Sequence, residues 1–163
     1  MKLRIGTGID VHDLQKGEDL VLGGVKIPSN LGITGHSDGD LILHALVDSI
    51  LGALAIGDIG QFFPSDDDKW KDADSKIFLD FALKKMKSFG FSINNIDITV
   101  VVQNIRINPH ATIIRKSISK LCNIDLSQVS LKATTTDKLG FLGRGEGIAS
   151  FITILLSDNY DSN

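Results

Sequence analysis

The sequence has little cysteine, no long apolar run and no excess of positive charge. Its single cysteine, Cys122, excludes a disulfide within the chain and fits a reducing compartment. The longest nearly uncharged apolar run, residues 41–56, contains His44 and Asp48 and is too short to span a bilayer. The net charge of −3 creates no field that attracts nucleic acid or anionic lipid. Because the first residues run directly into a strand-like pattern rather than a targeting segment, we expect a cytoplasmic protein without nucleic-acid or membrane partners.

The length and composition are those of one globular domain. A chain of 163 residues with 42% apolar residues can bury a core without disulfides or structural metals. No internal repeat or low-complexity segment divides it. We predict one domain over residues 1–158 and a frayed tail over residues 159–163.

The spacing of apolar residues predicts an α+β fold. The last strand is apolar on both faces, so we expect it at the centre of the sheet or at a subunit contact. The order of elements favours an antiparallel or mixed sheet with helices on one face, and residues 28–35 and 58–72 are predicted as turns and loops. The predicted strands are 3–11, 96–103, 128–134 and 148–156, with a hairpin at 20–27 and helices at 38–55, 74–89 and from 108.

Asp10 and His12 flank Val11 at the end of the first predicted strand. Residues two apart in a strand share a face, so we expect both polar side chains on one side and Val11 directed to the core. A carboxylate beside an imidazole offers two ligands for zinc or a similar cation. The same pair also suits a strand-end hydrogen bond, and the residues alone leave both interpretations open.

His44 lies at the edge of the apolar stripe of the first long helix. A histidine there can be a half-buried structural residue or a third metal ligand. Asp40 and Asp48, four residues to either side, are candidates to accept a hydrogen bond from its second ring nitrogen. Together with Asp10 and His12 it would leave one tetrahedral position open, which is typical of a catalytic rather than a structural zinc site.

Two further segments are suited to phosphate. Residues 35–40 precede the helix that carries His44, where free amides and the helix dipole favour an anion and His36 can donate a hydrogen bond. Residues 132–147 hold three successive threonines, Asp137, Arg144 and several glycines, a composition that can form an anion nest and a Mg²⁺ ligand. A helix cap in the first segment and a tight turn with solvated charges in the second are the simpler interpretations.

Taken in order, these motifs make the chain resemble the 2-C-methyl-D-erythritol 2,4-cyclodiphosphate synthases of the non-mevalonate isoprenoid pathway. The resemblance extends from residue 3 to about residue 156 with compatible spacing. The matching segments are 8–12, 35–40 with His44, 57–60, 73–75, 132–136, and 138–141 with 143–147.

The resemblance implies a homotrimer of ferredoxin-like subunits with active sites between neighbours. It implies Zn²⁺ on Asp10, His12 and His44, and a second ion, Mg²⁺ or Mn²⁺, near Asp137. The implied reaction converts 4-diphosphocytidyl-2-C-methyl-D-erythritol 2-phosphate into a cyclic diphosphate and CMP. In the family the central cavity of the trimer can also hold an isoprenoid diphosphate, near the position of Arg144.

The resemblance also assigns roles to individual residues. His36 and Thr135 match transition-state stabilisers, Asp58 and Gly60 match contacts to the methylerythritol part, and residues 102–108 match the loop that takes the cytosine. The full set of substrate-binding positions implied is Asp10, Val11, His12, His36, Ser37, Asp58, Ile59, Gly60, Phe63, Asp67, Val102, Arg106, Ile107, Asn108, Thr134, Thr135, Thr136, Asp137, Phe141 and Arg144.

The chain departs from the family pattern at three positions, and two other functions are compatible with its residues. Asp137 replaces a glutamate, Ser65 stands where aspartate is common, and Ile9 replaces a phenylalanine that faces the trimer cavity. A zinc phosphohydrolase would use the open metal position to activate water, with Asp58 or Asp40 as the base. A non-catalytic trimer would bind isoprenoid diphosphates without turnover.

Overall fold

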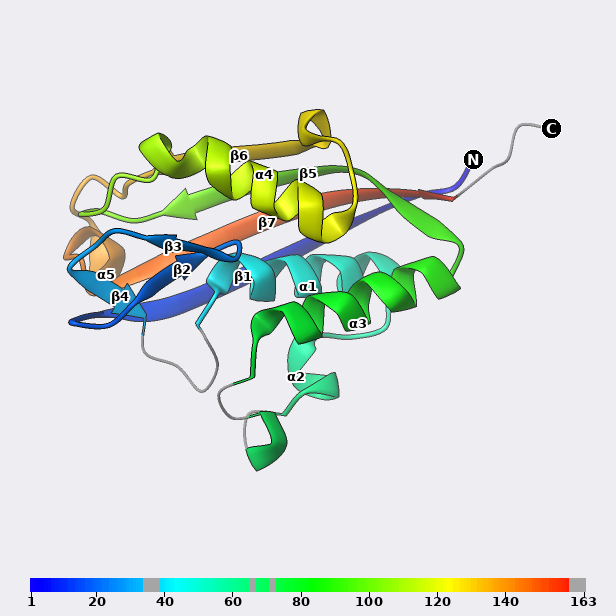
Figure 1. Ribbon diagram of the computed structural model, residues 1–163, viewed down its shortest axis with the longest axis horizontal. Helices are drawn as coiled ribbons and strands as arrows, with labels where there is room; N and C mark the ends of the chain where they lie inside the picture. The colour runs from blue at the N-terminus through cyan, green and yellow to red at the C-terminus, as the bar shows by residue number, and fades with distance from the viewer. Residues whose placement is uncertain (34–38, 65–66, 71–72, 159–163) are drawn as a thin grey trace.

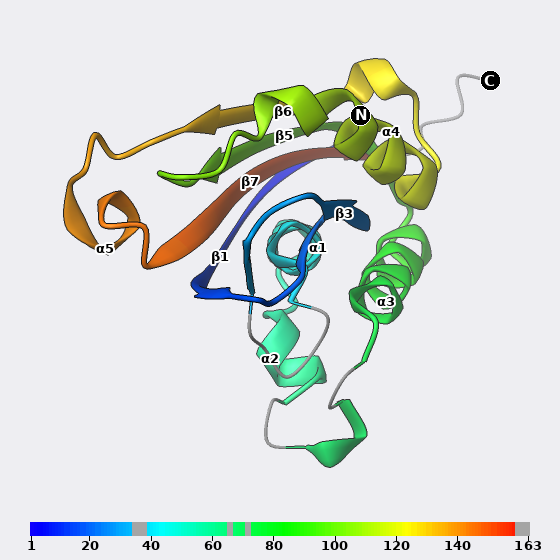
Figure 2. The same cartoon turned by 60° about the vertical axis from the view of Figure 1, so that its left-hand side comes forward.

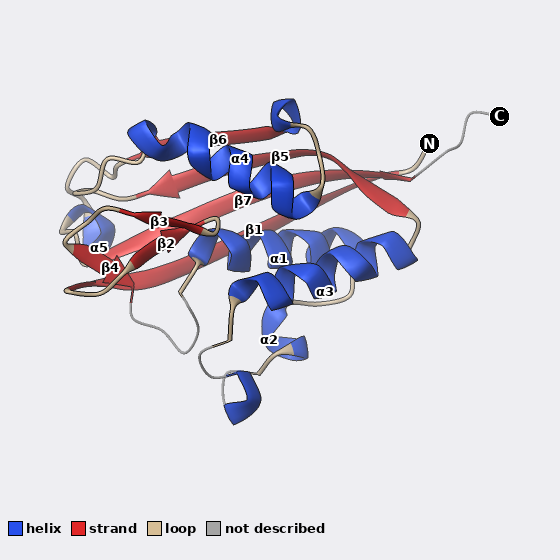
Figure 3. Ribbon diagram, in the orientation of Figure 1, coloured by secondary structure: helices blue, strands red, loops and turns tan. Residues whose placement is uncertain are grey.

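The computed structural model describes residues 1–33, 39–64, 67–70 and 73–158. It is an α+β fold in which one curved sheet carries its long helices on a single face (Figures 1 and 3), as the sequence predicts. The sheet has the order β4-β1-β7-β5-β6. Its strands are β1 Leu3–Lys16, β4 Leu31–Ile33, β5 Phe91–Val101, β6 Val129–Thr134 and β7 Gly147–Asp158.

Among the described residues, three long helices and a small hairpin complete the core. The helices are α1 Leu41–Leu54, α3 Ser75–Ser88 and α4 Ala111–Cys122, and the hairpin is β2 Leu20–Leu22 with β3 Val25–Ile27. The short elements are α2 Ile59–Phe62, α5 Gly140–Gly143 and single 3-10 turns at Asp68–Trp70, Asn108–His110 and Leu126–Gln128.

Strand β7 lies at the centre of the sheet, as its apolar sequence predicts. It pairs antiparallel with β1 on one side and with β5 on the other, whereas β5 and β6 pair in parallel across the α4 connection. The sheet is therefore mixed. Its inner face packs on the long helices, and no long helix of the described residues covers its outer face (Figure 2).

Helix α1 lies directly on β1 because two glycines of the strand face it. A Cβ atom at Gly8 would lie 1.8 Å from the carbonyl oxygen of Ala45, and one at Gly6 would lie 1.9 Å from that of Ser49. Any larger residue would therefore force the helix away from the strand. The hairpin and α3 enclose α1 on its other sides, so it is buried around nearly its whole circumference (Figure 2).

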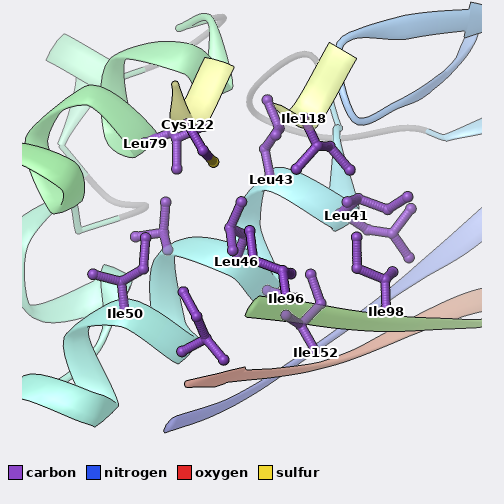
Figure 4. Packing of buried hydrophobic residues seen from close by; sticks show 14 of the residues in the cluster. Leu41, Leu43, Leu46, Ile50, Leu79, Ile96, Ile98, Ile118, Cys122 and Ile152 are labelled. Atoms are coloured by element: carbon purple, nitrogen blue, oxygen red, sulfur yellow. The ribbon is translucent and has the colours of Figure 1, made fainter. Parts of the chain in front are cut away.

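The core forms between α1 and the inner face of the sheet (Figure 4). Leu46 and Ile50 of α1 are completely buried together with Ile96 and Ile152 of the central strands. Cys122 is 6% exposed at the end of α4, and burial raises the pKa of its thiol to about 12. Cys122 is therefore a small buried hydrophobic residue rather than a reactive thiol.

Several predicted boundaries are wrong, including the start of β5, which begins at Phe91 rather than at residue 96. Strand β1 continues to Lys16, where its last residues pair with β4 inside the segment 28–35 that we predicted as turns. The predicted loop 58–72 contains α2, which begins where Asp58 accepts a hydrogen bond from the Gln61 amide at 2.9 Å. These elements are only three or four residues long, too short for periodicity to reveal.

Within the described ranges, no helix is both long and apolar enough to cross a membrane. The predicted tail, residues 159–163, lies outside the described residues. The assignment of residues 1–158 to one domain stays a prediction.

Candidate metal centre

Asp10 and His12 of β1 converge with His44 of α1. Asp10 Oδ2 lies 3.0 Å from His12 Nε2 and 3.2 Å from His44 Nδ1. One ligand atom from each residue lies within 4.8 Å of the others, and all three residues are half-buried. A carboxylate and two imidazoles that point at one place are a donor set that fits zinc or a similar divalent ion.

The two glycines and the strand alternation explain this convergence. Gly8, Asp10 and His12 share the face of β1 that α1 covers, and Gly8 contacts the helix at Ala45, the residue after His44. Val11 is 45% exposed on the outer face of the sheet. Our expectation that Val11 points to the core is therefore wrong, because the core lies on the glycine side of this strand.

Asp40 fixes the residue at which α1 begins and thereby the position of His44 along the helix. It is completely buried and is the N-cap of the helix, where Oδ1 accepts from the Leu43 amide at 3.1 Å. The same carboxylate accepts from the Gly23 amide of the hairpin at 2.8 Å. A single side chain thus joins the first turn of the helix to the β2–β3 turn.

The ligand candidates shift each other's pKa values. Hydrogen bonding to Asp10 raises the pKa of His12 above its ordinary value, while partial burial opposes the change. Burial alone would raise the pKa of Asp10, but the hydrogen bonds and charges of His12 and His44 together outweigh it and hold that pKa well below its usual range. Asp10 therefore remains an ionised carboxylate, which is the form that binds a cation.

The second nitrogen of His44 has a partner that we did not predict. Ser75 Oγ lies 2.8 Å from Nε2, and the Phe78 ring is 6.0 Å from the imidazole, centroid to centroid. Of the two carboxylates we had proposed for this role, Asp40 caps the helix, and Asp48 accepts from the Ile59 amide at 2.7 Å. The signal that could have identified Ser75 is its place at the start of a predicted helix, within segment 73–75.

Residues 58–63 are tied to this centre through α1 and α3. The Asp48–Ile59 hydrogen bond holds the start of α2 against α1, next to Asp58 and Gly60. The Phe63 ring packs on Phe78 with centroids 4.6 Å apart. Asp67 is exposed and accepts from the Lys69 amide at 3.0 Å.

A separate pocket of about 560 Å³ gathers six of the substrate-binding positions named from the sequence. It lies between the segment after β5 and the end of β6. The six positions are Val102, Arg106, Ile107, Asn108, Thr134 and Thr135, and the pocket is further lined by Gln103, Asn104, Ile105, Pro109 and Ala133.

The glycine-rich segment after this pocket is strongly turned. Asp137 adopts a positive φ of 51°, and Thr135 Oγ1 donates to its carboxylate at 3.3 Å. Arg144 forms two hydrogen bonds with Glu146, at 2.7 and 3.0 Å. Thr136 Oγ1 donates to the Leu139 carbonyl oxygen at 2.7 Å, and Phe141 is exposed.

Not every predicted residue joins the cluster. Among the described residues, only Asp10, His12 and His44 form a group of three or more such side chains with converging ligand atoms, so Asp137 is not part of it. His36 and Ser37 lie outside the described residues, and their predicted roles stay predictions.

Comparison with known proteins identifies close relatives over nearly the whole chain. A sequence model of the YgbB family matches residues 3–157. The chain is 50% identical over 153 residues to the 2-C-methyl-D-erythritol 2,4-cyclodiphosphate synthase of Xanthomonas oryzae pathovar oryzae, covering 94% of each protein. It is also 50% identical over 154 residues to the synthase of Clostridium perfringens, covering 94% of this chain and 99% of that protein.

Solved structures of related proteins are also similar to this chain over nearly its whole length. The bifunctional IspDF of Campylobacter jejuni superposes with a TM-score of 0.92 at 39% identity, over 96% of this chain and 42% of that one. A CDP complex of IspF from Plasmodium falciparum superposes with a TM-score of 0.85 at 42% identity, over 96% of both chains.

The pKa shifts at the cluster predict how the stability of the metal-free protein depends on pH. The raised pKa of His12 contributes stability that is complete below about pH 6.5 and is lost as the pH rises through the shifted value. The lowered pKa of Asp10 contributes stability that is present above about pH 4 and is lost as the pH falls. In urea unfolding with a chelator present, we expect the urea concentration at the unfolding midpoint to decrease as the pH is raised from 6 to 8.

The matched variants for this measurement are His12→Asn and His110→Asn, because His110 lies on a different element. The first should flatten the slope between pH 6 and pH 8, and the second should preserve it. An equal slope in wild type and His12→Asn would contradict the assignment.

Proposed function

The chain belongs to the YgbB family, that of the 2-C-methyl-D-erythritol 2,4-cyclodiphosphate synthases, and we propose that it catalyses their reaction. The substrate would be 4-diphosphocytidyl-2-C-methyl-D-erythritol 2-phosphate, and the products 2-C-methyl-D-erythritol 2,4-cyclodiphosphate and CMP, in isoprenoid precursor biosynthesis. The observation that carries the proposal is the convergence of Asp10, His12 and His44 in a chain 50% identical to such synthases. The activity is that of a phosphorus–oxygen lyase.

In this reaction the protein mainly positions the substrate and offsets its negative charge. An oxygen of the 2-phosphate attacks the β-phosphorus, the bond from that phosphorus to the bridging oxygen breaks, and CMP leaves with the electron pair. The nucleophile belongs to the substrate, so no serine, cysteine or lysine nucleophile is required. Catalysis then consists of aligning two phosphates that repel each other and offsetting their charge.

Asp10, His12 and His44 would hold one Zn²⁺, which, when bound, offsets negative charge on phosphate oxygens. The support is the donor set and its partial burial. Asp137 would take part in binding a second ion, Mg²⁺ or Mn²⁺, together with the diphosphate. Its carboxylate is exposed beside Thr135 and Thr136, whose hydroxyls suit phosphate oxygens.

The cytidine would occupy the pocket formed by residues 102–109 and 133–135. The relative from Plasmodium falciparum was solved with CDP, and this pocket offers both backbone groups and the Thr134 and Thr135 side chains. His36 and Thr135 would stabilise the transition state. The methylerythritol part would lie against Asp58, Ile59 and Gly60, near the half-buried Phe63 ring and Asp67.

We further propose that three copies assemble through the outer face of the sheet. One row of β1 side chains and a paired residue of β7 leave this face apolar and exposed, and a second copy would cover it. Active sites would then lie between neighbours, and the cavity on the axis could hold an isoprenoid diphosphate near Arg144. The exposed apolar residues are Leu3, Ile5, Ile9, Val11 and Phe151.

Turnover in ¹⁸O-labelled water tests the reaction directly. We expect one CMP per cyclic diphosphate and no ¹⁸O in either product, measured by ³¹P NMR and mass spectrometry. His44→Ala should lower turnover by about 100-fold or more, since it removes a charge-stabilising ligand. Asp19→Asn, which breaks an exposed ion pair with Lys26, is the control and should retain activity.

Incorporation of ¹⁸O would instead indicate a phosphohydrolase. An absence of turnover in the metal-loaded protein would indicate a binding protein. Either result would contradict the proposed reaction.

Sedimentation equilibrium tests the assembly. The wild-type protein should sediment at three times the mass of one chain, and Ile5→Asp should dissociate it, because the side chain is 70% exposed in a single chain and would be buried in the trimer. Ile113→Asp changes an equally apolar residue, 53% exposed on α4, and should leave the trimer intact. A monomeric wild type, or equal behaviour of the two variants, would exclude this interface.

A further inference from the structure

The Ser75 hydroxyl approaches the edge of the His44 ring that lies away from the ligand cluster. Its Oγ is 2.8 Å from Nε2, while Nδ1 of the same ring is 3.2 Å from Asp10 Oδ2. Ser75 is completely buried and is the first residue of α3. The preceding residue, Asp74, caps the helix by accepting from the Lys76 amide at 2.8 Å. The hydroxyl is therefore held by a capped helix rather than by a loop.

A second contact from the same helix holds the imidazole ring. Phe78 follows Ser75 by three residues and so lies on the same face of α3. Its ring is 4% exposed and lies 6.0 Å from that of His44, at an interplanar angle of 49°. The hydroxyl and the phenyl ring together restrict how the imidazole can turn.

We propose that Ser75 is a positioning residue of the metal centre and acts through His44. The proposal rests on the proposed zinc-dependent function. A nitrogen that binds metal carries no proton, so with Nδ1 on the ion, Nε2 carries the proton and needs an acceptor. Ser75 Oγ is that acceptor, at a site where a lost partner would leave a mostly buried N–H unsatisfied.

A hydroxyl suits this position because its oxygen can both donate and accept a hydrogen bond. Ser75 Oγ can therefore partner His44 Nε2 whichever ring nitrogen carries the proton. An ionised carboxylate in its place could only accept.

The test compares zinc affinity in three full-length proteins by competition with a chelator: wild type, Ser75→Ala and Ser49→Ala. Ser49 is the matched control because it is also completely buried and its hydroxyl donates to the Leu46 carbonyl oxygen at 2.8 Å, on the same helix as His44. We expect Ser75→Ala to weaken zinc binding by about 10- to 100-fold, the range for a lost partner of a ligating histidine. Ser49→Ala should bind zinc as the wild type does.

A second measurement separates positioning from general destabilisation. In the zinc-loaded wild type, NMR should detect a slowly exchanging proton on His44 Nε2, and this proton should be lost to exchange in Ser75→Ala but retained in Ser49→Ala. Equal zinc affinity of Ser75→Ala and wild type would overturn the proposal while leaving the proposed function in place. A wild type that binds no zinc would overturn both.

Discussion

The close contact between α1 and β1 is the constraint on which the rest of the molecule depends. Gly6 and Gly8 remove the side chains that would otherwise separate helix and strand, so the backbones meet at Ala45 and Ser49. Two residues beyond Gly8 the strand carries Asp10, and one residue before Ala45 the helix carries His44. The contact that packs the core thus also sets the distance between the ligand candidates.

The surrounding elements hold this arrangement from the other sides. Asp40 joins the start of α1 to the hairpin, Asp48 joins its middle to α2, and Ser75 joins His44 to α3. Each is a polar group, half or fully buried, whose hydrogen bond crosses between elements, so each restricts a different direction of movement. The centre is accordingly assembled on a helix and a strand, which position ligands more firmly than loops do.

The sequence predicted the long elements, whose residue patterns are clear, and missed short elements that depend on their neighbours in the fold. The helices that became α1 and α3 have clear periodicity, and Asp74 marked the start of α3 correctly. The central β7 was recognised because its sequence is apolar on both faces. Strand β4 and helix α2 were missed because three or four residues cannot show a period.

The candidate site likewise contains features that the sequence predicted and features that it did not. Asp10, His12 and His44 were expected together and lie together. The face on which Val11 lies was predicted wrongly, because alternation gives two faces and does not say which one a helix will cover. Ser75 could not be paired with His44 from spacing, since the contact joins residues 31 positions apart on different helices.

Zinc affinity in Gly8→Ala measures most directly whether the contact between helix and strand forms the proposed metal centre. The added methyl group would overlap the Ala45 carbonyl, so we expect a loss of stability of about 1–3 kcal/mol and a zinc dissociation constant raised by about tenfold or more. Gly52→Ala is the control on α1, because a Cβ there would meet only the Thr7 oxygen at 3.9 Å. It should leave zinc binding unchanged and stabilise the helix by about 0.5–1 kcal/mol. Zinc binding by Gly8→Ala as tight as that of the wild type would contradict the account.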